Sequence, residues 1–184
     1  MNVLVCNHKD NNYPKCFRDT SVLLQKDFII LNGMALGCDT IALKTVVKEG
    51  KKAIVVLPCG FDNIQPKSNI VLMEEIISLG GLVLSEYPNG TVLSKYMYVQ
   101  RDRLQAAIAD IVFVIECKEK SGTMHTVDFA LKYMKPVACF QDLFEKNANG
   151  NQYLINSKKA YPIHDTPSLN LFLMNNMFQQ LSFV

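Results

Sequence analysis

Two arginines and a glycine turn lie on either side of a short apolar run. Arg101 and Arg103 come first, the run Ile111–Ile115 follows, and the Ser-Gly-Thr turn 121–123 comes next, preceded by Lys120. The first N–H groups of a helix have no partner inside the helix, so a helix that begins at such a turn can bind an anion. A guanidinium adds paired donors that match a phosphate. We therefore predict a phosphate-bearing ligand, with both arginines at an exposed helix start.

Two further glycine loops follow apolar runs. Gly33 and Gly37 come after the run Phe28–Leu31, and Gly60 comes after the run Lys52–Leu57. Glycine lets the backbone approach a ligand closely, which suits a phosphate-binding loop. The same pattern is common in ordinary turns after a strand, so both interpretations stay open for each loop.

Three side chains near these loops could contact a base or a ribose. Glu86 follows an apolar run and could accept hydrogen bonds from a ligand, or it could pair with Arg101 or Arg103. Asp39 could contact the ligand or cap the next helix. Tyr98 could stack on a base, as aromatic side chains do in single-strand binding proteins, or it could pack against its neighbours.

The composition is that of one globular domain with little excess charge. The chain has 184 residues, 49% of them hydrophobic, and a formal net charge of +2. With so weak a net charge, any nucleic-acid site must be a local patch. We find no nucleophile–base pair, no metal-ligand spacing and no Walker A motif, so we expect no catalytic residue, no metal and no cofactor.

The six cysteines form no CxxC pair. Three of them, Cys6, Cys117 and Cys139, lie in or beside apolar runs, which is typical of buried thiols in a reduced intracellular protein. No signal peptide opens the chain, and no apolar run reaches the ~20 residues of a membrane span. We expect a cytoplasmic protein without membrane contact.

Short apolar runs alternate with amphipathic segments along the chain, which predicts an α/β fold with a doubly wound, mostly parallel sheet. Ligands bind such sheets at the carboxyl ends of the strands, where the strand order reverses. The expected strands are Asn2–Cys6, Phe28–Leu31, Lys52–Leu57, Gly81–Ser85, Ile111–Ile115, Pro136–Phe140 and an edge strand at Tyr161–Ile163. The expected helices are Pro14–Lys26, Cys38–Glu49, Lys67–Leu79, Arg101–Ala109, Thr123–Met134 and a closing helix over 167–181.

Five short segments occur together in one order: NGMALGCDT at 32–40, GFDNIQP at 60–66, GGLVLSEYPNGT at 80–91, RDR at 101–103 and SGT at 121–123. In these segments, and in GNQ at 150–152, the chain resembles the DNA-processing protein A (DprA or Smf) family. The resemblance implies an extended Rossmann-like domain that binds single-stranded DNA in natural transformation. It also implies transfer of that strand to a RecA-type recombinase, without enzymatic activity.

The chain departs from the family pattern in its first loop. The family has Gly-Ser/Thr-Arg after the first strand, where this chain has Cys6, Asn7 and His8. Asn7 and His8 are the candidates to hold the first phosphate in that place. We expect residues 1–184 to form one core domain, without the family's N-terminal helical or C-terminal winged-helix domains.

The expected partners are single-stranded DNA, a RecA-type recombinase and a second copy of the chain. A small-nucleotide sensor on the same fold is the alternative, and a nucleotide phosphoribohydrolase is a weaker one. The expected phosphate-binding residues are Asn7, His8, Gly33, Gly37, Gly60, Arg101, Arg103, Lys120, Ser121, Gly122 and Thr123. The expected base or ribose contacts are Asp39, Glu86 and Tyr98.

Overall fold

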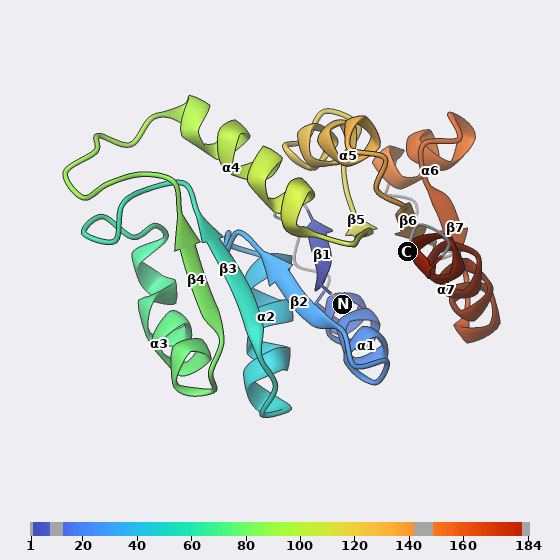
Figure 1. The fold of residues 1–184 in the computed structure, drawn as a ribbon, viewed down its shortest axis with the longest axis horizontal. Coiled ribbons are helices and arrows are strands. Elements are labelled where there is room, and N and C mark those ends of the chain that lie inside the picture. The colour runs from blue at the N-terminus through green and yellow to red at the C-terminus, as the bar shows by residue number, and fades with distance from the viewer. Residues whose placement is uncertain (1, 8–12, 142–148, 182–184) are drawn as a thin grey trace.

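A single seven-stranded sheet forms the centre of the molecule (Figure 1). The computed structural model describes residues 2–7, 13–141 and 149–181. The strands are β1 (Asn2–Asn7), β2 (Ile29–Asn32), β3 (Ala53–Leu57), β4 (Leu82–Ser85), β5 (Ile111–Glu116), β6 (Val137–Phe140) and β7 (Tyr161–Ile163). Their order is β4-β3-β2-β1-β5-β6-β7, and every neighbouring pair is parallel. The order reverses between β1 and β5, so the ligand site expected of this topology lies at their carboxyl ends.

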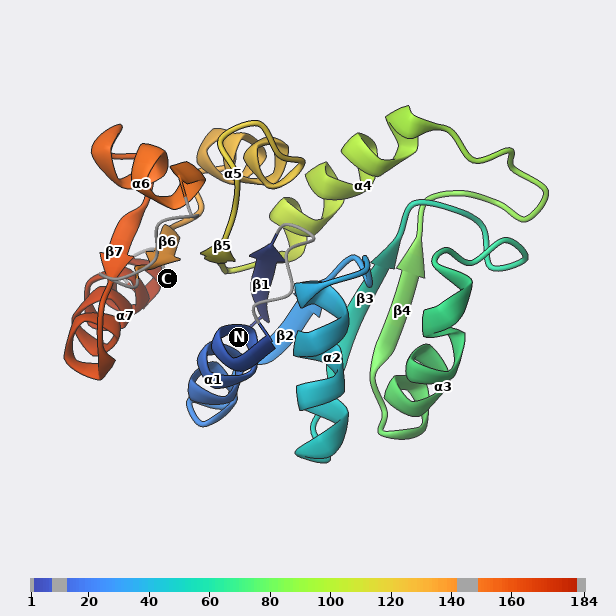
Figure 2. The same ribbon diagram turned by 180° about the vertical axis from the view of Figure 1, so that it is seen from behind.

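Helices cover both faces of the sheet, because the buried strands are apolar on both sides (Figures 1 and 2). One face carries α1 (Tyr13–Leu24), α2 (Cys38–Lys48), the 3-10 turn Lys67–Asn69 with α3 (Ile70–Ser78), and α7 (Thr166–Leu181). The other face carries α4 (Lys95–Ile108), α5 (Thr123–Lys132) and α6 (Asn149–Asn156). The predicted doubly wound α/β fold is therefore confirmed.

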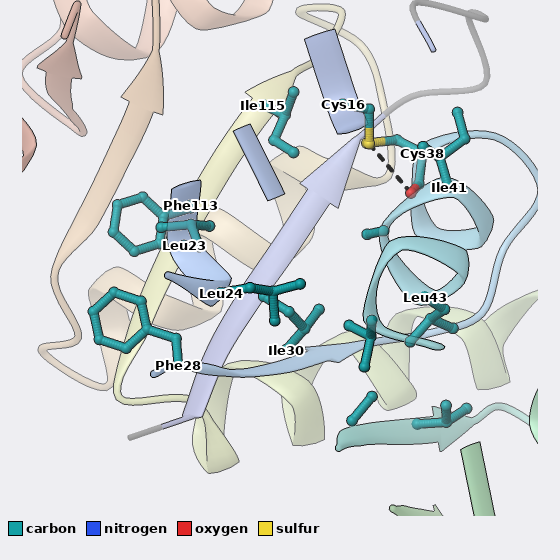
Figure 3. Packing of buried hydrophobic residues seen from close by; sticks show 14 of the residues in the cluster. Cys16, Leu23, Leu24, Phe28, Ile30, Cys38, Ile41, Leu43, Phe113 and Ile115 are labelled. Carbon is teal, nitrogen blue, oxygen red and sulfur yellow. Dashed lines mark hydrogen bonds between the residues drawn. A yellow bond between two sulfur atoms is a disulfide. The ribbon is translucent and has the colours of Figure 1, made fainter. Parts of the chain in front are cut away.

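The core under α1 and α7 is organised around one aromatic side chain, Phe113 of β5, which is fully buried. Its ring centroid lies 6.4 Å from that of Phe28, 5.7 Å from that of Phe140 and 5.8 Å from that of Phe172. Figure 3 shows Phe113 with Phe28 and the leucines of α1. These contacts join β5, β6 and α7 in one closely packed cluster, which holds β5 in place beside β1 at the switch point.

The predicted start of one helix is wrong. We expected it at Arg101, but α4 begins at Lys95, after Ser94 in an extended conformation. Residues 96–99 form a continuous apolar and aromatic run without helical periodicity, and residues 95–100 contain no acid to mark a first helical turn. Arg101 and Arg103 consequently lie inside the helix and not at its exposed start.

The expectation of reduced thiols is wrong for two of the cysteines. A disulfide joins Cys16 of α1 to Cys38, the first residue of α2 (Figure 3). The pair is 22 residues apart in sequence, and only the packing of α1 against α2 brings it together. Cys117 and Cys139 are free and buried, as expected, and burial raises the pKa of the Cys117 thiol to about 12. In the described ranges, no helix is both long and apolar enough to cross a membrane.

Candidate functional site

The loops that carry the predicted residues converge on the carboxyl edge of the sheet. At the switch point, Asn7 ends β1 and is paired in register with Glu116 of β5. The side chain of Asn7 and the whole of His8 lie outside the described residues, so their predicted phosphate contacts stay predictions. The loops after β2, β3, β4 and β5 are described and can be followed contact by contact.

The loop after β2 is held together by Asp39. One carboxylate oxygen accepts hydrogen bonds from the N–H groups of Gly33, at 3.1 Å, and Ala35, at 3.2 Å. Burial raises the pKa of Asp39 to about 6, although the Arg101 charge and both N–H groups lower it. Gly37 enters α2 with φ 94°, which favours glycine. The structure thus gives Asp39 and Gly37 roles in shaping the loop, and their ligand contacts stay predictions.

Two buried asparagines that we did not predict complete this loop. Asn69 donates hydrogen bonds to the Met34 carbonyl at 3.0 Å and to the Thr40 hydroxyl at 2.7 Å. Asn32 accepts a hydrogen bond from the Met34 N–H group at 3.0 Å. The sequence signals were slight: Asn32 is a polar residue at the end of an apolar run, and Asn69 directly precedes one.

Arg101 is a buried residue that joins α4 to the loop after β2 and to strand β3. Its guanidinium donates hydrogen bonds to the carbonyls of Gly33, at 2.9 Å, and Val56, at 3.1 Å. Its Nε donates to Asp102 at 3.0 Å, and the residue is only 7% exposed. The expectation of an exposed phosphate-binding Arg101 is therefore corrected: the donors are engaged inside the protein.

Arg103 pairs with Glu86 at the protein surface. Its Nη2 lies 2.7 Å from both carboxylate oxygens, and the side chains are 36% and 39% exposed. The hydrogen bond and charge of Glu86 raise the pKa of the Arg103 guanidinium. Of the alternatives left open for Glu86, the structure therefore shows the ion pair.

Gly60 allows the loops after β3 and β4 to touch. A Cβ at this position would lie 2.7 Å from the Pro88 carbonyl oxygen, closer than real Cβ atoms approach backbone. Across the same contact, the Asn89 side chain accepts a hydrogen bond from the Phe61 N–H group at 3.0 Å. The structure therefore gives Gly60 a packing role, and a ligand contact there stays a prediction.

The turn 121–123, by contrast, faces solvent at the start of α5. Gly122 is exposed, and a Cβ added to it would meet no atom within 4 Å. Lys120 is exposed beside it, Thr123 is 7% exposed, and the Ser121 hydroxyl donates to the Lys118 carbonyl at 2.7 Å. The helix N-terminus is thus accessible to an anion.

Asn151 holds the strand end from which this turn departs. Its side chain accepts a hydrogen bond from the Cys117 N–H group at 2.8 Å and donates hydrogen bonds to the carbonyls of Ile115 and Phe140, each at 3.0 Å. The residue is 2% exposed. We did not predict it as a site residue, although the GNQ segment at 150–152 was part of the resemblance to the family.

The structure brings the predicted residues into three groups. Gly33, Asp39 and Arg101 form a buried network, Glu86 and Arg103 form a surface ion pair, and 121–123 forms an open turn. Tyr98 is 39% exposed, and its ring centroid lies 5.9 Å from the Cζ atom of the Arg101 guanidinium. Within the described part of the chain, no cluster of His, Cys, Asp and Glu suits a metal ion.

Comparison with known proteins agrees with this architecture. The sequence pattern of the family described as DNA recombination-mediator protein A matches residues 6–173. The chain is 31% identical over 137 residues to DNA processing protein DprA of Bacillus subtilis, covering 74% of this chain and 46% of the relative. It is 33% identical over 118 residues to protein Smf of Synechocystis sp., covering 64% of this chain and 29% of the relative.

A solved structure extends the likeness to almost the whole chain. The chain superposes on DNA processing protein A from Helicobacter pylori with a TM-score of 0.80 at 28% identity. That structure concerns the single-stranded DNA binding mode of the Helicobacter protein. The match covers 98% of this chain and 81% of that one. The chain spans less than half the length of the two curated relatives. With its residues 6–173 matched, the chain belongs to the DNA recombination-mediator protein A family.

Proposed function

We propose that the chain binds single-stranded DNA along the carboxyl edge of its sheet, with the turn 121–123 as a phosphate site. The observation that carries the proposal is the open N-terminus of α5 at the β1–β5 switch point, where nothing lies within 4 Å of a Cβ on Gly122. Anions bind at such helix starts, and this topology binds ligands at this place.

The charges and aromatic groups at this edge suit an unpaired strand. Lys118 and Lys120 are exposed beside the turn, and Tyr98 offers a partly exposed ring on which a base could stack. Arg103 lies at the surface near this edge, and it would have to share its guanidinium between Glu86 and a phosphate. Strong salt dependence follows, because lysines and arginines that neutralise phosphates release counterions.

The family description supports a role as a mediator. We propose that the protein passes the bound strand to a RecA-type recombinase during DNA uptake, as a homodimer in the cytoplasm. The relatives are DNA-processing proteins, and we propose binding without catalysis for this chain.

A small nucleotide is the second candidate ligand, because the described residues line an open cavity of about 460 Å³ between α1 and the start of α7. Lys15 and Arg18 lie on one side of it, Asp19 and Asp165 also line it, and Phe140 and Leu169 provide an apolar wall. The apolar wall would suit a base, and a phosphate would compete with Asp19 for Arg18, since these two side chains pair at 3.0 Å.

Fluorescence anisotropy distinguishes the two. Labelled oligo-dT, a duplex of the same length and a panel of nucleoside phosphates are titrated at two salt concentrations. We expect oligo-dT to bind more tightly than duplex and to lose affinity as salt rises. Equal binding of both DNAs, or binding of nucleotides alone, would contradict the proposal.

A further inference from the structure

We propose that Phe61 and Tyr96 form a second contact site for unpaired bases, beyond the phosphate site at residues 121–123. The inference rests on the proposed function. Both rings are exposed, Phe61 by 50% and Tyr96 by 68%, in or directly after the loops that follow β3 and β4. Figures 1 and 2 show these two loops projecting together beyond the end of β4.

The Phe61 side chain is exposed, but hydrogen bonds hold the backbone of its loop in place. Its N–H group donates to the Asn89 side chain at 3.0 Å, and Gly90 donates its N–H to the Asp62 carboxylate at 2.7 Å. At the base of the loops, the Ser85 hydroxyl donates to the Cys59 carbonyl at 2.7 Å. Because the backbone that carries the ring is already held in place, less conformational entropy is lost when a base stacks on it.

Tyr96 lies near the same pair of loops. It is the second residue of α4, and α4 directly follows the loop after β4. Tyr96 is in the first turn of α4, so its backbone is fixed by the helix. Phe61 is therefore carried by one of two loops that are hydrogen-bonded to each other, and Tyr96 directly follows the other.

The chemistry of this surface fits bases better than a folded protein partner. Lys95 is exposed next to Tyr96, and Lys67 is exposed after the first loop, so cations accompany the rings. Aromatic rings interspersed with lysines bind single strands with little sequence preference. The rings lie on the carboxyl edge, like the turn 121–123, so a strand leaving that turn toward β4 reaches them without crossing to another face.

The test compares Phe61→Ala and Tyr96→Ala with Tyr153→Ala, which removes an exposed tyrosine from α6 on the far side of the switch point. Each protein is titrated with oligo-dT of about six and about 20 nucleotides, lengths that bracket typical single-strand sites. We expect the Phe61 and Tyr96 variants to bind the longer strand about tenfold more weakly, while the shorter strand is nearly unaffected. Phe61→Trp and Tyr96→Phe should keep wild-type affinity.

The outcomes separate the two proposals. If wild-type protein fails to bind either oligonucleotide, the proposed function is wrong. If wild type binds and the Phe61 and Tyr96 variants bind the longer strand as tightly as Tyr153→Ala does, only the second site is wrong. A 2-aminopurine placed along the longer strand should lose fluorescence on binding wild type and regain it in the two alanine variants.

Discussion

The guanidinium of Arg101 fills the space that a side chain at Gly33 would need. It donates to the Gly33 carbonyl at 2.9 Å, and a Cβ on Gly33 would lie 1.9 Å from the same nitrogen. The glycine after β2 and the first arginine of the RDR segment therefore depend on each other, although they are 68 residues apart. This relationship explains both residues as parts of the folded framework that positions the edge loops.

Arg101→Ala should destabilise the protein by about 3–5 kcal/mol, because it leaves Asp102 and the carbonyls of Gly33 and Val56 without their buried donor. Denaturant unfolding followed by circular dichroism measures the loss. Arg103→Ala is the matched control, and its exposed ion pair should contribute less than about 1 kcal/mol. Equal stability of the two variants would show that Arg101 is not structural.

Gly122→Val should weaken oligo-dT binding at least about tenfold, because the new side chain would crowd a phosphate at the start of α5. Its φ is −56° and the surrounding space is open, so the fold should tolerate valine. Ser121→Ala removes one hydroxyl and should bind nearly normally. Melting temperature and dissociation constant are measured on the same samples, and normal binding by folded Gly122→Val would exclude a phosphate site there.

Asp39 should make stability depend on pH in a defined direction. Its pKa is raised from 3.8 to about 6 in the folded state, so the folded protein holds this proton more tightly than the unfolded chain does. Its contribution to stability is therefore greatest below pH 4, falls as the pH rises to about 6, and is constant above that.

Asp39→Asn removes this titration and keeps an acceptor for the Gly33 and Ala35 N–H groups. The free energy of unfolding of wild type, relative to this variant, should thus decrease between pH 4 and 6. A difference that stays constant or increases over this range would mean that burial does not control the Asp39 carboxyl.

The Cys16–Cys38 disulfide should contribute about 3 kcal/mol, the value for a closed loop of this length. Cys16→Ala with Cys38→Ala should therefore unfold at lower denaturant concentration than oxidised wild type. Peptide mapping without reductant checks the bond itself. Absence of a linked peptide in protein purified without reductant would show that both cysteines remain thiols.

The sheet could be predicted from the sequence because its strands are continuous apolar runs between turn residues. Ile111–Glu116 and Ala53–Leu57 are buried along nearly their whole length, and such runs have few other interpretations. The start of α4 could not be predicted, since residues 96–99 are a continuous apolar and aromatic run and no acid marks the first helical turn. The disulfide could not be predicted because the packing of two helices, and not spacing, brings its cysteines together.

The site was predicted less completely than the fold. The pairing of Glu86 with Arg103 was among the alternatives that the sequence allowed, and the structure shows it. The buried position of Arg101 depends on its hydrogen bonds to the Gly33 and Val56 carbonyls, which are far away in the sequence, and no local pattern encodes them. Asn69 and Asn151 were missed because a buried asparagine resembles a loop residue until its partners are known.

The most direct test of the central proposal is to follow backbone amide resonances by NMR while oligo-dT is added to isotopically labelled protein. If a phosphate binds at the start of α5, the amides of Ser121, Gly122 and Thr123 should show the largest shifts, with Gly122 moving downfield as its N–H group gains a charged acceptor. A duplex of the same sequence should shift them less at equal concentration. Saturable binding that shifts amides elsewhere and leaves residues 121–123 unchanged would contradict the proposal.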